Sequence, residues 1–540
     1  MRRLPYFGYY LLAVLLLWSW TPLRVGGQVA WPASGPEVCV VPSTWNVRPW
    51  STCSDAIAVD ASTNCADAAL SIDISRGETE SVQVLIRKAA DLDDKVGGMS
   101  NVNVAVEINN DDASVDADIY QVAYVDTKRS PRYQGSGGGW RGDPLIPLTN
   151  AIDILPDVTQ SIWISFRVSR TASSSNVTGS LIITCTEKCG KSGITIPIKM
   201  QAFSVDMPLL NESEIGSAWS GSWTEETFEP YYGGANATWK WNESKYDWFD
   251  MMMSHRMPPD SIYLTQPRPI EDYAYMAKNG ARWFALLDVS SLPENEDVHP
   301  RKFQGSCRNF SQAYIDSMID TLRPIVSSVE KLGLLDRAYI YGFDENPPSC
   351  EPQVRKLFGA TKKAFPRLKT AAVLNWNPMP VDLPVDIWIL QYQEFDAENA
   401  KNWVNAGKLQ WHYHCIEPHS LQYLNTFIER PGMQSRLLFW LAALNEARYG
   451  APSGWLYYAV NLWRPCNADD CGGAHTPSVL RAKQGGPFSD FPPANFVWRG
   501  QYDDIFVNGD GQYLYPGPSG PLATTRLECI RDGLEDWELF

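Results

Sequence analysis

Segments typical of strands and helices alternate along the chain beyond Pro208, and this alternation limits the possible folds more than any other feature. The strand segments are short runs of β-branched and aromatic residues with little polar interruption, as in strands covered on both faces. Eight strands are predicted, at Glu214–Trp219, Ser261–Thr265, Trp283–Val289, Arg337–Glu345, Lys369–Asn375, Asp386–Tyr392, Leu409–Cys415 and Gly454–Trp463. Helix-length segments separate most of them, at Lys245–His255, Ile270–Lys278, Gln312–Leu332, Gln353–Phe365, Ala397–Asn405 and Gln434–Tyr449.

Eight strands joined by crossover helices predict a (β/α)8 barrel of the TIM type. The link between Asn375 and Asp386 is rich in proline and predicts no full helix. A doubly wound open sheet is the main alternative. Such sheets usually carry a glycine-rich nucleotide loop after the first strand, and the sequence has none there.

The residues before Pro208 follow a different pattern. From about Val38 onward, short segments alternate polar and apolar residues, with turn-rich gaps and almost no helical periodicity. This pattern predicts an antiparallel β-sandwich. A chain of 540 residues is long enough for several domains with their own cores. We therefore expect a signal peptide at 1–27, a β-sandwich accessory domain at 28–208 and a catalytic barrel at 209–540.

The N-terminus predicts export. Arg2 and Arg3 precede a short apolar run, and small residues follow it, which is the pattern of a signal peptide. An uncleaved signal anchor is the alternative, although the run is short for a membrane span. Asn-x-Ser/Thr sequons are consistent with a secreted glycoprotein. They lie at Asn176, Asn211, Asn236, Asn242 and Asn309. We expect a secreted or lumenal protein without membrane contact beyond a possible anchor.

The 11 cysteines include two close pairs and one cluster near the expected mature N-terminus, which suits an oxidising compartment. These are Cys185 with Cys189, Cys466 with Cys471, and the cluster Cys39, Cys53 and Cys65. The sequence leaves the disulfide pairing open. Neither close pair has the spacing of a zinc site, and His412 and His414, which would share one face of a strand, lack a second ligand set. We expect no metal and no cofactor.

Charge and aromatic content narrow the class of partner. The net charge of −16 argues against nucleic acid and anionic membranes, since both are polyanions. The 22 Trp and 24 Tyr are many for this length, and sugar sites favour such residues because sugar C–H faces pack on flat rings. Large cores also use aromatic residues, so this indication of a glycan partner is weak.

The functional prediction rests on the segment Arg337–Asn346. It reads as a buried strand that ends in two adjacent carboxylates, Asp344 and Glu345, before two prolines. Acids at the end of a strand also serve as helix caps or as solvated residues. In a barrel, however, the active site lies at the carboxyl ends of the strands.

Several other predicted strands end in polar or aromatic residues, and such a collection at one rim is typical of a sugar-binding cleft. These residues are Asp288, Asn375, Tyr392, Glu394, Glu417, Asn461 and Trp463. Trp219, Trp283 and Trp463 are the tryptophans that we predict to contact substrate.

Adjacent carboxylates suit substrate-assisted glycoside hydrolysis better than the usual arrangement of two separated acids. The 2-acetamido oxygen of the substrate attacks the anomeric carbon, one carboxylate orients the acetamide, and the other is the general acid and then the base. We predict that Asp344 is the orienting group and Glu345 the acid/base. Tyr392 and Asn461 are candidates to hold the acetamido oxygen.

The segment Tyr339-Ile-Tyr-Gly-Phe-Asp-Glu345 resembles the catalytic motif of the family 123 glycoside hydrolases. Four further segments resemble that family in the same order, and with the N-terminal β region they extend the resemblance over nearly the whole mature chain. They are His255–Tyr263, Gly454–Trp463, Gly509–Pro516 and Arg526–Asp536. The resemblance implies a retaining β-N-acetylgalactosaminidase that uses Asp344 and Glu345 in the roles given above, behind an accessory sandwich.

Two alternatives remain. One is an ordinary retaining glycosidase in which Glu394 or Glu417 is the nucleophile facing Glu345. The other is a non-catalytic protein that binds carbohydrate with the same fold. The sequence does not decide between galacto and gluco stereochemistry.

Overall fold

The structure is a computed structural model, and it describes two compact units. Described residues are 36–57, 69–88, 98–109, 114–127, 139–172, 176–186, 193–219, 241–292, 307–418, 420–457, 496–497, 509, 511–517 and 520–540. The first unit takes in Met1–Val122 and Leu145–Met207, and the second takes in Ala123–Pro144 and Pro208–Phe540. The chain thus passes between units at Pro208, but one earlier excursion groups with the second unit.

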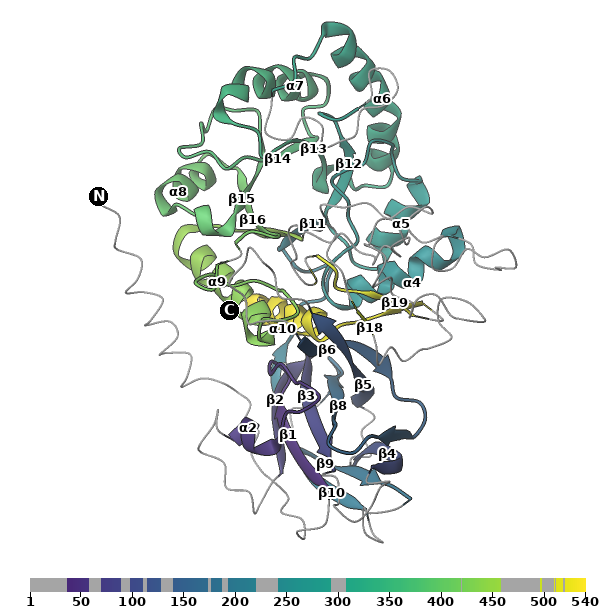
Figure 1. Cartoon of the computed structure of the whole chain (residues 1–540). Coiled ribbons are helices and arrows are strands. Elements are labelled where there is room, and N and C mark those ends of the chain that lie inside the picture. Colours follow the sequence, from purple (N-terminus) through teal and green to yellow (C-terminus); the bar gives the residue numbers. More distant parts are fainter. Residues whose placement is uncertain are drawn as a thin grey trace, which may run out of the picture. The chain divides into compact units, whose positions relative to one another are not determined.

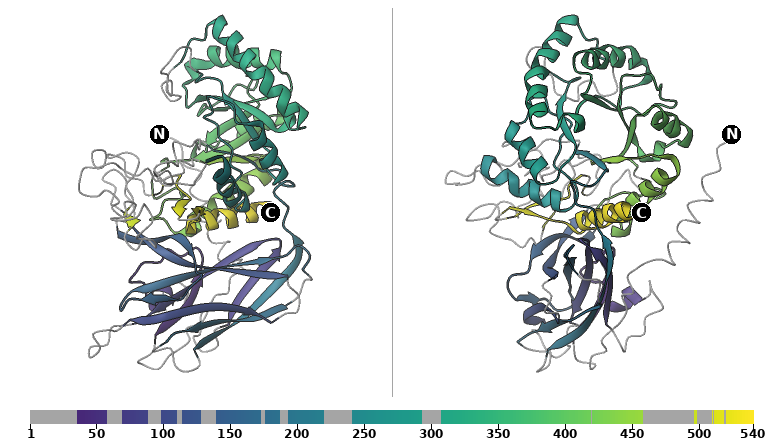
Figure 2. Two further views of the ribbon diagram at one scale, coloured as in Figure 1. Left: turned by 90° about the vertical axis from the view of Figure 1, so that its right-hand side faces the viewer. Right: turned by 180° about the vertical axis from the view of Figure 1, so that it is seen from behind.

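The first unit contains two stacked layers of strands (Figure 2). One sheet has the order β1-β3-β8-β5, and the other has the order β2-β10-β9-β4-β7. Neighbours pair antiparallel, except that β2 and β10 run parallel. The strands are β1 (Glu37–Pro42), β2 (Leu70–Arg76), β3 (Thr79–Arg87), β4 (Met99–Ile108), β7 (Ile152–Ile154), β8 (Thr159–Val168), β9 (Asn176–Thr184), β10 (Ile194–Asp206) and the first part of β5 (Val115–Thr127). The rest of β5 and most of β6 (Gly139–Pro147) lie in the excursion that groups with the second unit.

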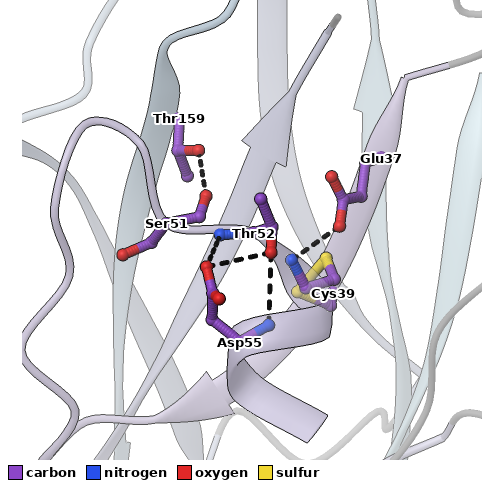
Figure 3. The surroundings of a disulfide bond; sticks show 7 residues. Glu37, Cys39, Ser51, Thr52, Asp55 and Thr159 are labelled. Atoms are coloured by element: carbon purple, nitrogen blue, oxygen red, sulfur yellow. Dashed lines mark hydrogen bonds between the residues drawn. A yellow bond between two sulfur atoms is a disulfide. The ribbon is translucent and has the colours of Figure 1, made fainter. Parts of the chain in front are cut away.

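Alternating side chains fill the space between these layers. Along β10, Ile194, Ile196 and Ile198 are buried while the residues between them are exposed, and they join one apolar cluster with residues of both sheets. A disulfide between Cys39 and Cys53 ties β1 to the short helix α2 (Cys53–Ile57) (Figure 3). The predicted β-sandwich is confirmed.

The second unit is a nearly closed parallel barrel with helices outside it (Figure 1). The described strands follow the order β11-β17-β16-β15-β14-β13-β12, and every pair is parallel. They are β11 (Gly216–Trp219), β12 (Phe284–Asp288), β13 (Ala338–Asp344), β14 (Lys369–Val373), β15 (Ile387–Gln391), β16 (Leu409–His414) and β17 (Gly454–Tyr457). The helices are α4 (Trp241–Ser254), α5 (Ile270–Lys278), α6 (Gln312–Lys331), α7 (Glu351–Ala364), α8 (Ala397–Asn405), α9 (Gly432–Tyr449) and α10 (Thr525–Leu539).

The predicted second strand, Ser261–Thr265, is wrong as a regular strand. This segment lies beside β12, where the Asp288 N–H donates to the Leu264 carbonyl at 2.7 Å, and Ile262 joins the apolar cluster inside the barrel. Prolines flank it, and its link to β12 is partly a side-chain link, because both oxygens of Asp260 accept the Ala285 N–H at 2.9 and 2.8 Å. As predicted, residues 374–386 contain no helix.

Trp411 fills the amino-terminal half of the barrel. Its ring packs edge-on against Trp283 and Tyr339, with ring centroids 5.2 and 5.7 Å away. Gly216 and Gly454 make room for it: a Cβ on Gly216 would lie 2.2 Å from the Trp411 ring. The barrel interior is therefore a packed core at this end, and chemistry is left to the other end.

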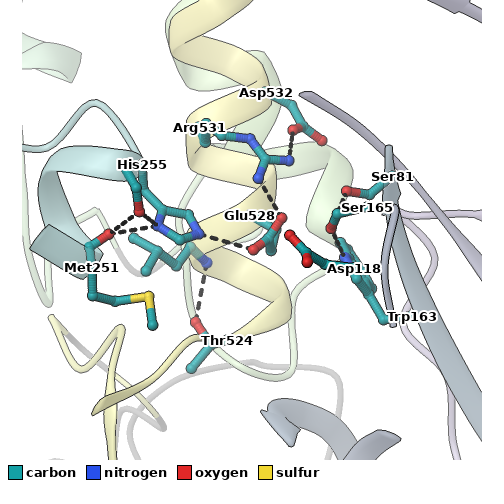
Figure 4. A network of polar contacts seen from close by, with 12 residues as sticks. Ser81, Asp118, Trp163, Ser165, Met251, His255, Thr524, Glu528, Arg531 and Asp532 are labelled. Atoms are coloured by element: carbon teal, nitrogen blue, oxygen red, sulfur yellow. Dashed lines mark hydrogen bonds and ion pairs between the residues drawn. The ribbon is translucent and has the colours of Figure 1, made fainter. Parts of the chain in front are cut away.

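Helix α10 closes the ring of helices through buried charges. Glu528 contacts His255 Nε2 at 2.8 Å, and Arg531 donates to Glu528 at 2.5 Å and to Asp532 at 2.7 Å (Figure 4). All four side chains are buried. Buried charges are stable only when paired, so this network fixes how α10 packs.

The predictions about export concern the cysteine pairs and the signal peptide, and only some of these residues are described. Cys307 is bonded to Cys350, Cys185 is also disulfide-bonded, and Cys466 and Cys471 lie outside the described residues. The expected signal peptide lies outside them too. Among the helices that are described, none combines the length and apolar character needed to cross a bilayer.

Candidate active site

A bulge at the end of β13 turns the acidic pair into the barrel. Tyr339 and Tyr341 point inward, so regular alternation would also point Phe343 inward. The strand register instead shifts between Tyr341 and Asp344, and Phe343 joins the apolar cluster outside the barrel. Phe343 and Glu345 have φ values of +64° and +53°, a conformation that costs a residue other than glycine roughly 1–3 kcal/mol.

Two tyrosine hydroxyls hold Asp344. Tyr263 donates to Oδ2 at 2.6 Å, and Tyr341 donates to Oδ1 at 3.0 Å. Both tyrosines come from the inner surface of the barrel, and their rings meet edge to face at 5.8 Å. Asp344 is half-buried, and the two hydroxyls fix the position of its carboxylate.

Glu345 is held by the backbone of β14 and by the side chain of Tyr413. Its N–H donates to the Val373 carbonyl at 2.8 Å, and the Tyr413 hydroxyl donates to its Oε1. Asn375 Nδ2 donates in turn to the Tyr413 hydroxyl at 3.2 Å. Burial, with the nearby Glu345 carboxylate, raises the pKa of Tyr413 well above its usual range, so this hydroxyl keeps its proton and remains a donor.

Asp288 is a third carboxyl beside the pair. It ends β12, is 2% exposed, and accepts from the Ser290 N–H at 3.0 Å and from the Ser290 hydroxyl at 2.9 Å. Burial raises the pKa of Asp288 to about 7, with a further contribution from the negative charge of Asp344. Asp288 therefore carries a proton over much of the weakly acidic range.

The predicted substrate contacts differ in where they lie. The Tyr392 hydroxyl donates to the Leu424 carbonyl at 2.7 Å, so the backbone already uses it. Trp283 precedes β12 and lies at the amino end of the barrel, buried against Trp411. It is thus at the end of the barrel opposite to Asp344 and Glu345. The side chain of Trp219 and the residues Asn461 and Trp463 lie outside the described part of the chain.

Sequence reasoning missed the tyrosines that contact the acids. Tyr413 sits two residues after the inward Trp411 on the same strand, so the period of two was an available signal for its direction. Tyr263 lies in an irregular segment, where no period applies. Asn375, which was predicted at the rim, does reach Tyr413.

No metal centre is evident in the described residues, where no group of three or more His, Cys, Asp or Glu has the geometry to hold an ion. His412 and His414 share the outer face of β16, as predicted. Burial lowers the pKa of each to about 3, so both are neutral. His414 Nδ1 accepts from the Trp455 indole at 3.0 Å, which makes it a structural residue.

The arrangement of the site can be set beside known proteins. The family model "Glycoside hydrolase 123, catalytic domain" matches residues 285–540, which include both carboxylates. The structure of a family 123 glycoside hydrolase from Clostridium perfringens, studied for glycolipid glycan hydrolysis, aligns with a TM-score of 0.65. It is 11% identical and covers 93% of this chain and 88% of its own, a level at which the likeness shows the fold alone.

A more distant likeness carries no argument. Xylanase 10B from Thermotoga maritima is 10% identical, covers 62% of this chain and 99% of its own, and aligns with a TM-score of only 0.31. The search of curated proteins found no match.

Proposed function

Through residues 285–540 the chain belongs to glycoside hydrolase family 123, and on that premise we propose that it removes terminal β-linked N-acetylgalactosamine by substrate-assisted catalysis. The enzyme acts on glycans as a glycoside hydrolase; the proposal adds the sugar, the retaining outcome and the roles of the two acids. We also propose that it is exported, because the N-terminus has the pattern of a signal peptide and the described cysteines include two disulfides.

One observation carries the proposal: adjacent, half-buried carboxylates at the carboxyl end of a barrel strand, each held by tyrosine hydroxyls. Two acids on neighbouring residues leave little room for one to attack the sugar while the other protonates the leaving group. They suit a reaction in which the substrate supplies the nucleophile. Asp344 and Glu345 then act on different atoms of the same sugar.

The steps balance as follows. Asp344 accepts the acetamide N–H, which raises the electron density on the acetamido oxygen. That oxygen forms a bond to the anomeric carbon as the glycosidic C–O bond breaks, and Glu345 gives its proton to the leaving oxygen. Water then attacks the anomeric carbon of the oxazolinium ring, gives a proton to Glu345 and restores the acetamide. Two inversions give retention.

The natural substrate class is part of the proposal. The Clostridium perfringens enzyme is described as acting on glycolipid glycans, and we extend that class to this chain. A terminal 2-acetamido sugar on such a glycan would place its anomeric carbon at the Asp344–Glu345 rim.

The test uses the purified protein with aryl β-glycosides of N-acetylgalactosamine, N-acetylglucosamine and galactose. We expect release from the first, and none from the galactoside, which has no acetamide. Glu345→Gln should lose most turnover with an alkyl or sugar leaving group, and should recover towards the native rate with dinitrophenol, which needs no proton. Asp344→Asn should stay slow with every leaving group.

Other outcomes would replace the mechanism. Cleavage of the galactoside at a similar rate, with covalent labelling of the protein by a 2-fluoro sugar, would point to a protein nucleophile such as Glu394 or Glu417. Binding of the sugars without release over days would support the non-catalytic alternative.

A further inference from the structure

The strained backbone around Asp344 requires something to hold it. Phe343 and Glu345 both lie in the left-handed region, at φ +64° and +53°, and neither is glycine. In regular alternation along the strand, Asp344 would point out of the barrel. The residues that fix this bulge therefore decide whether the two acids reach the substrate.

A directed chain of hydrogen bonds reaches the bulge from β12. The Phe343 N–H donates to Ser290 Oγ at 3.1 Å. Because Ser290 Oγ accepts there, its single hydrogen is free to point elsewhere, and it donates to Asp288 Oδ1 at 2.9 Å. The Ser290 N–H donates to the same Oδ1 at 3.0 Å. The buried carboxyl of Asp288 thus orients the hydroxyl that anchors the bulge.

A second set of contacts fixes Ser290 itself. Arg308 Nη1 donates to the carbonyls of Ser290 and Leu292, each at 3.1 Å. The Arg308 side chain is 8% exposed, and its guanidinium lies over the rings of Phe310 and Tyr314, 5.5 and 4.4 Å from their centroids. A buried arginine held in this way gives the turn after β12 a single position.

The side chain of Phe343 is held on the outer side of the same bulge. Its ring meets Phe310 and Phe358 edge to face at 5.9 and 5.2 Å. The disulfide between Cys307 and Cys350 joins the stretch before Arg308 to the stretch after Glu345. The hydrogen bond from its N–H and the aromatic contacts of its ring therefore hold Phe343 from both sides.

We propose that Ser290, with Asp288 and Arg308 behind it, is a positioning residue for the catalytic pair: it holds the Phe343 bulge that turns Asp344 and Glu345 into the site. The inference rests on the proposed function of those two acids. Ser290 acts through the backbone of β13, not on the substrate. Its loss should therefore lower the rate of the bound complex more than the binding of substrate.

The test compares Ser290→Ala with Ser290→Thr and with Ser327→Ala, using 4-nitrophenyl 2-acetamido-β-galactoside. Ser290→Ala should lower kcat at least about tenfold and change KM less than about twofold, because a misplaced acid group slows chemistry. Ser290→Thr keeps the hydroxyl and should restore most of kcat. Ser327→Ala is the matched control: its side chain is exposed on α6, and its loss should leave kcat near the native value.

A crystal structure of Ser290→Ala gives a readout that does not depend on activity. We expect φ of Phe343 to leave the left-handed region and the Asp344 carboxylate to part from Tyr341. If Ser290→Ala does not fold, Arg308→Lys tests the same turn, since it keeps the charge but loses the paired bonds to the carbonyls of Ser290 and Leu292. It should lower kcat in the same direction.

The outcomes separate this inference from the proposed function. An active native enzyme that loses activity with Glu345→Gln but not with Ser290→Ala would overturn the inference and leave the function standing. A native enzyme that cleaves none of the aryl substrates would count against the function. The crystal structure of Ser290→Ala would then decide the inference alone, and an unchanged bulge would refute it.

Discussion

At the residue scale, Tyr263 is the side chain whose role can be tested most cleanly. Its hydroxyl donates to Asp344 Oδ2 at 2.6 Å, and the proposed orienting role needs that carboxylate in one position. Tyr263→Phe should lower kcat for 2-acetamido substrates about tenfold or more, since loss of one preorganised donor commonly costs this much. Tyr275→Phe is the control, because its hydroxyl donates to the exposed Asp250 on the surface. Equal rates for both variants would contradict the assignment.

Asp288 makes a prediction about stability and pH. Burial raises its pKa to about 7, so between about pH 4 and pH 7 the folded chain keeps a proton that the unfolded chain has released. The free energy of unfolding should therefore fall as pH rises through that window. Asp288→Asn removes the titration, so urea unfolding at pH 5 and pH 8 should show a smaller decrease for the variant. Asp316→Asn, at an exposed residue, is the control and should show the same decrease as the native chain. If the free energy of unfolding of the native chain falls no more between pH 5 and pH 8 than that of Asp288→Asn, the prediction is wrong.

Which tyrosines meet the acids could be predicted only in part. Asp344 and Glu345 follow from their place at the end of a hydrophobic strand. Tyr392 and Tyr413 both sit near strand ends, and the choice between them depends on the stagger of neighbouring strands. The Tyr392 hydroxyl donates to a backbone carbonyl and the Tyr413 hydroxyl donates to Glu345. The period of two indicates the direction of each ring along its strand, but not the partner that the hydroxyl meets.

At the scale of elements, glycines in the barrel strands allow one large ring to fill the interior. A Cβ on Gly216 would lie 2.2 Å from Trp411, whereas a Cβ on Gly359, in α7, would have no described atom within 4 Å. Gly216→Ala should lower the free energy of unfolding by about 1–3 kcal/mol. Gly359→Ala should leave it unchanged or raise it by up to about 1 kcal/mol, because alanine favours helix. Denaturant unfolding measures the free energy of unfolding of both variants. Similar values would contradict the close contact between Gly216 and Trp411.

The elements themselves were largely predictable, because their periods and boundary residues are local. Helices α5 and α8 begin and end at the predicted residues. The bulge at Phe343 had one local sign, Gly342, because a glycine inside a strand often marks a bulge. Its restraint was not predictable, because it comes from Ser290, some fifty residues away. The prolines on both sides of Ser261–Thr265 were the available sign that this strand would be irregular.

At the scale of the whole molecule, a residue from the first half of the chain stabilises the barrel unit. Asp143, in the excursion Ala123–Pro144, pairs with Arg526 of α10 at 2.8 Å, and both side chains are buried. Asp143→Ala leaves a buried arginine without its carboxylate and should cost about 3–5 kcal/mol of stability. Asp118→Ala, which breaks an exposed pair with Arg167, should cost about 1 kcal/mol or less. A thermal melt with equal shifts would contradict this account.

The same pair explains why the domain limits could be read only in part. The change of pattern at Pro208 is a local signal that predicts a boundary, and the second unit includes Pro208–Phe540. The return of Ala123–Pro144 to the second unit depends on Asp143, Tyr515 and Arg526 meeting in space. Nothing in the alternating pattern near Asp143 indicates such a partner. A fragment of residues 209–540 would lack Asp143 altogether.

The central claim is that the substrate's own acetamide is the nucleophile at the Asp344–Glu345 pair. The most direct measurement is kcat/KM for 4-nitrophenyl β-galactosaminides whose N-acetyl group carries zero, one, two or three fluorine atoms. Fluorine withdraws electrons from the acetamido oxygen, so the account predicts a steep fall in rate with each substitution. Rates that do not change with fluorination would show that the acetamide does not attack, and would contradict the account.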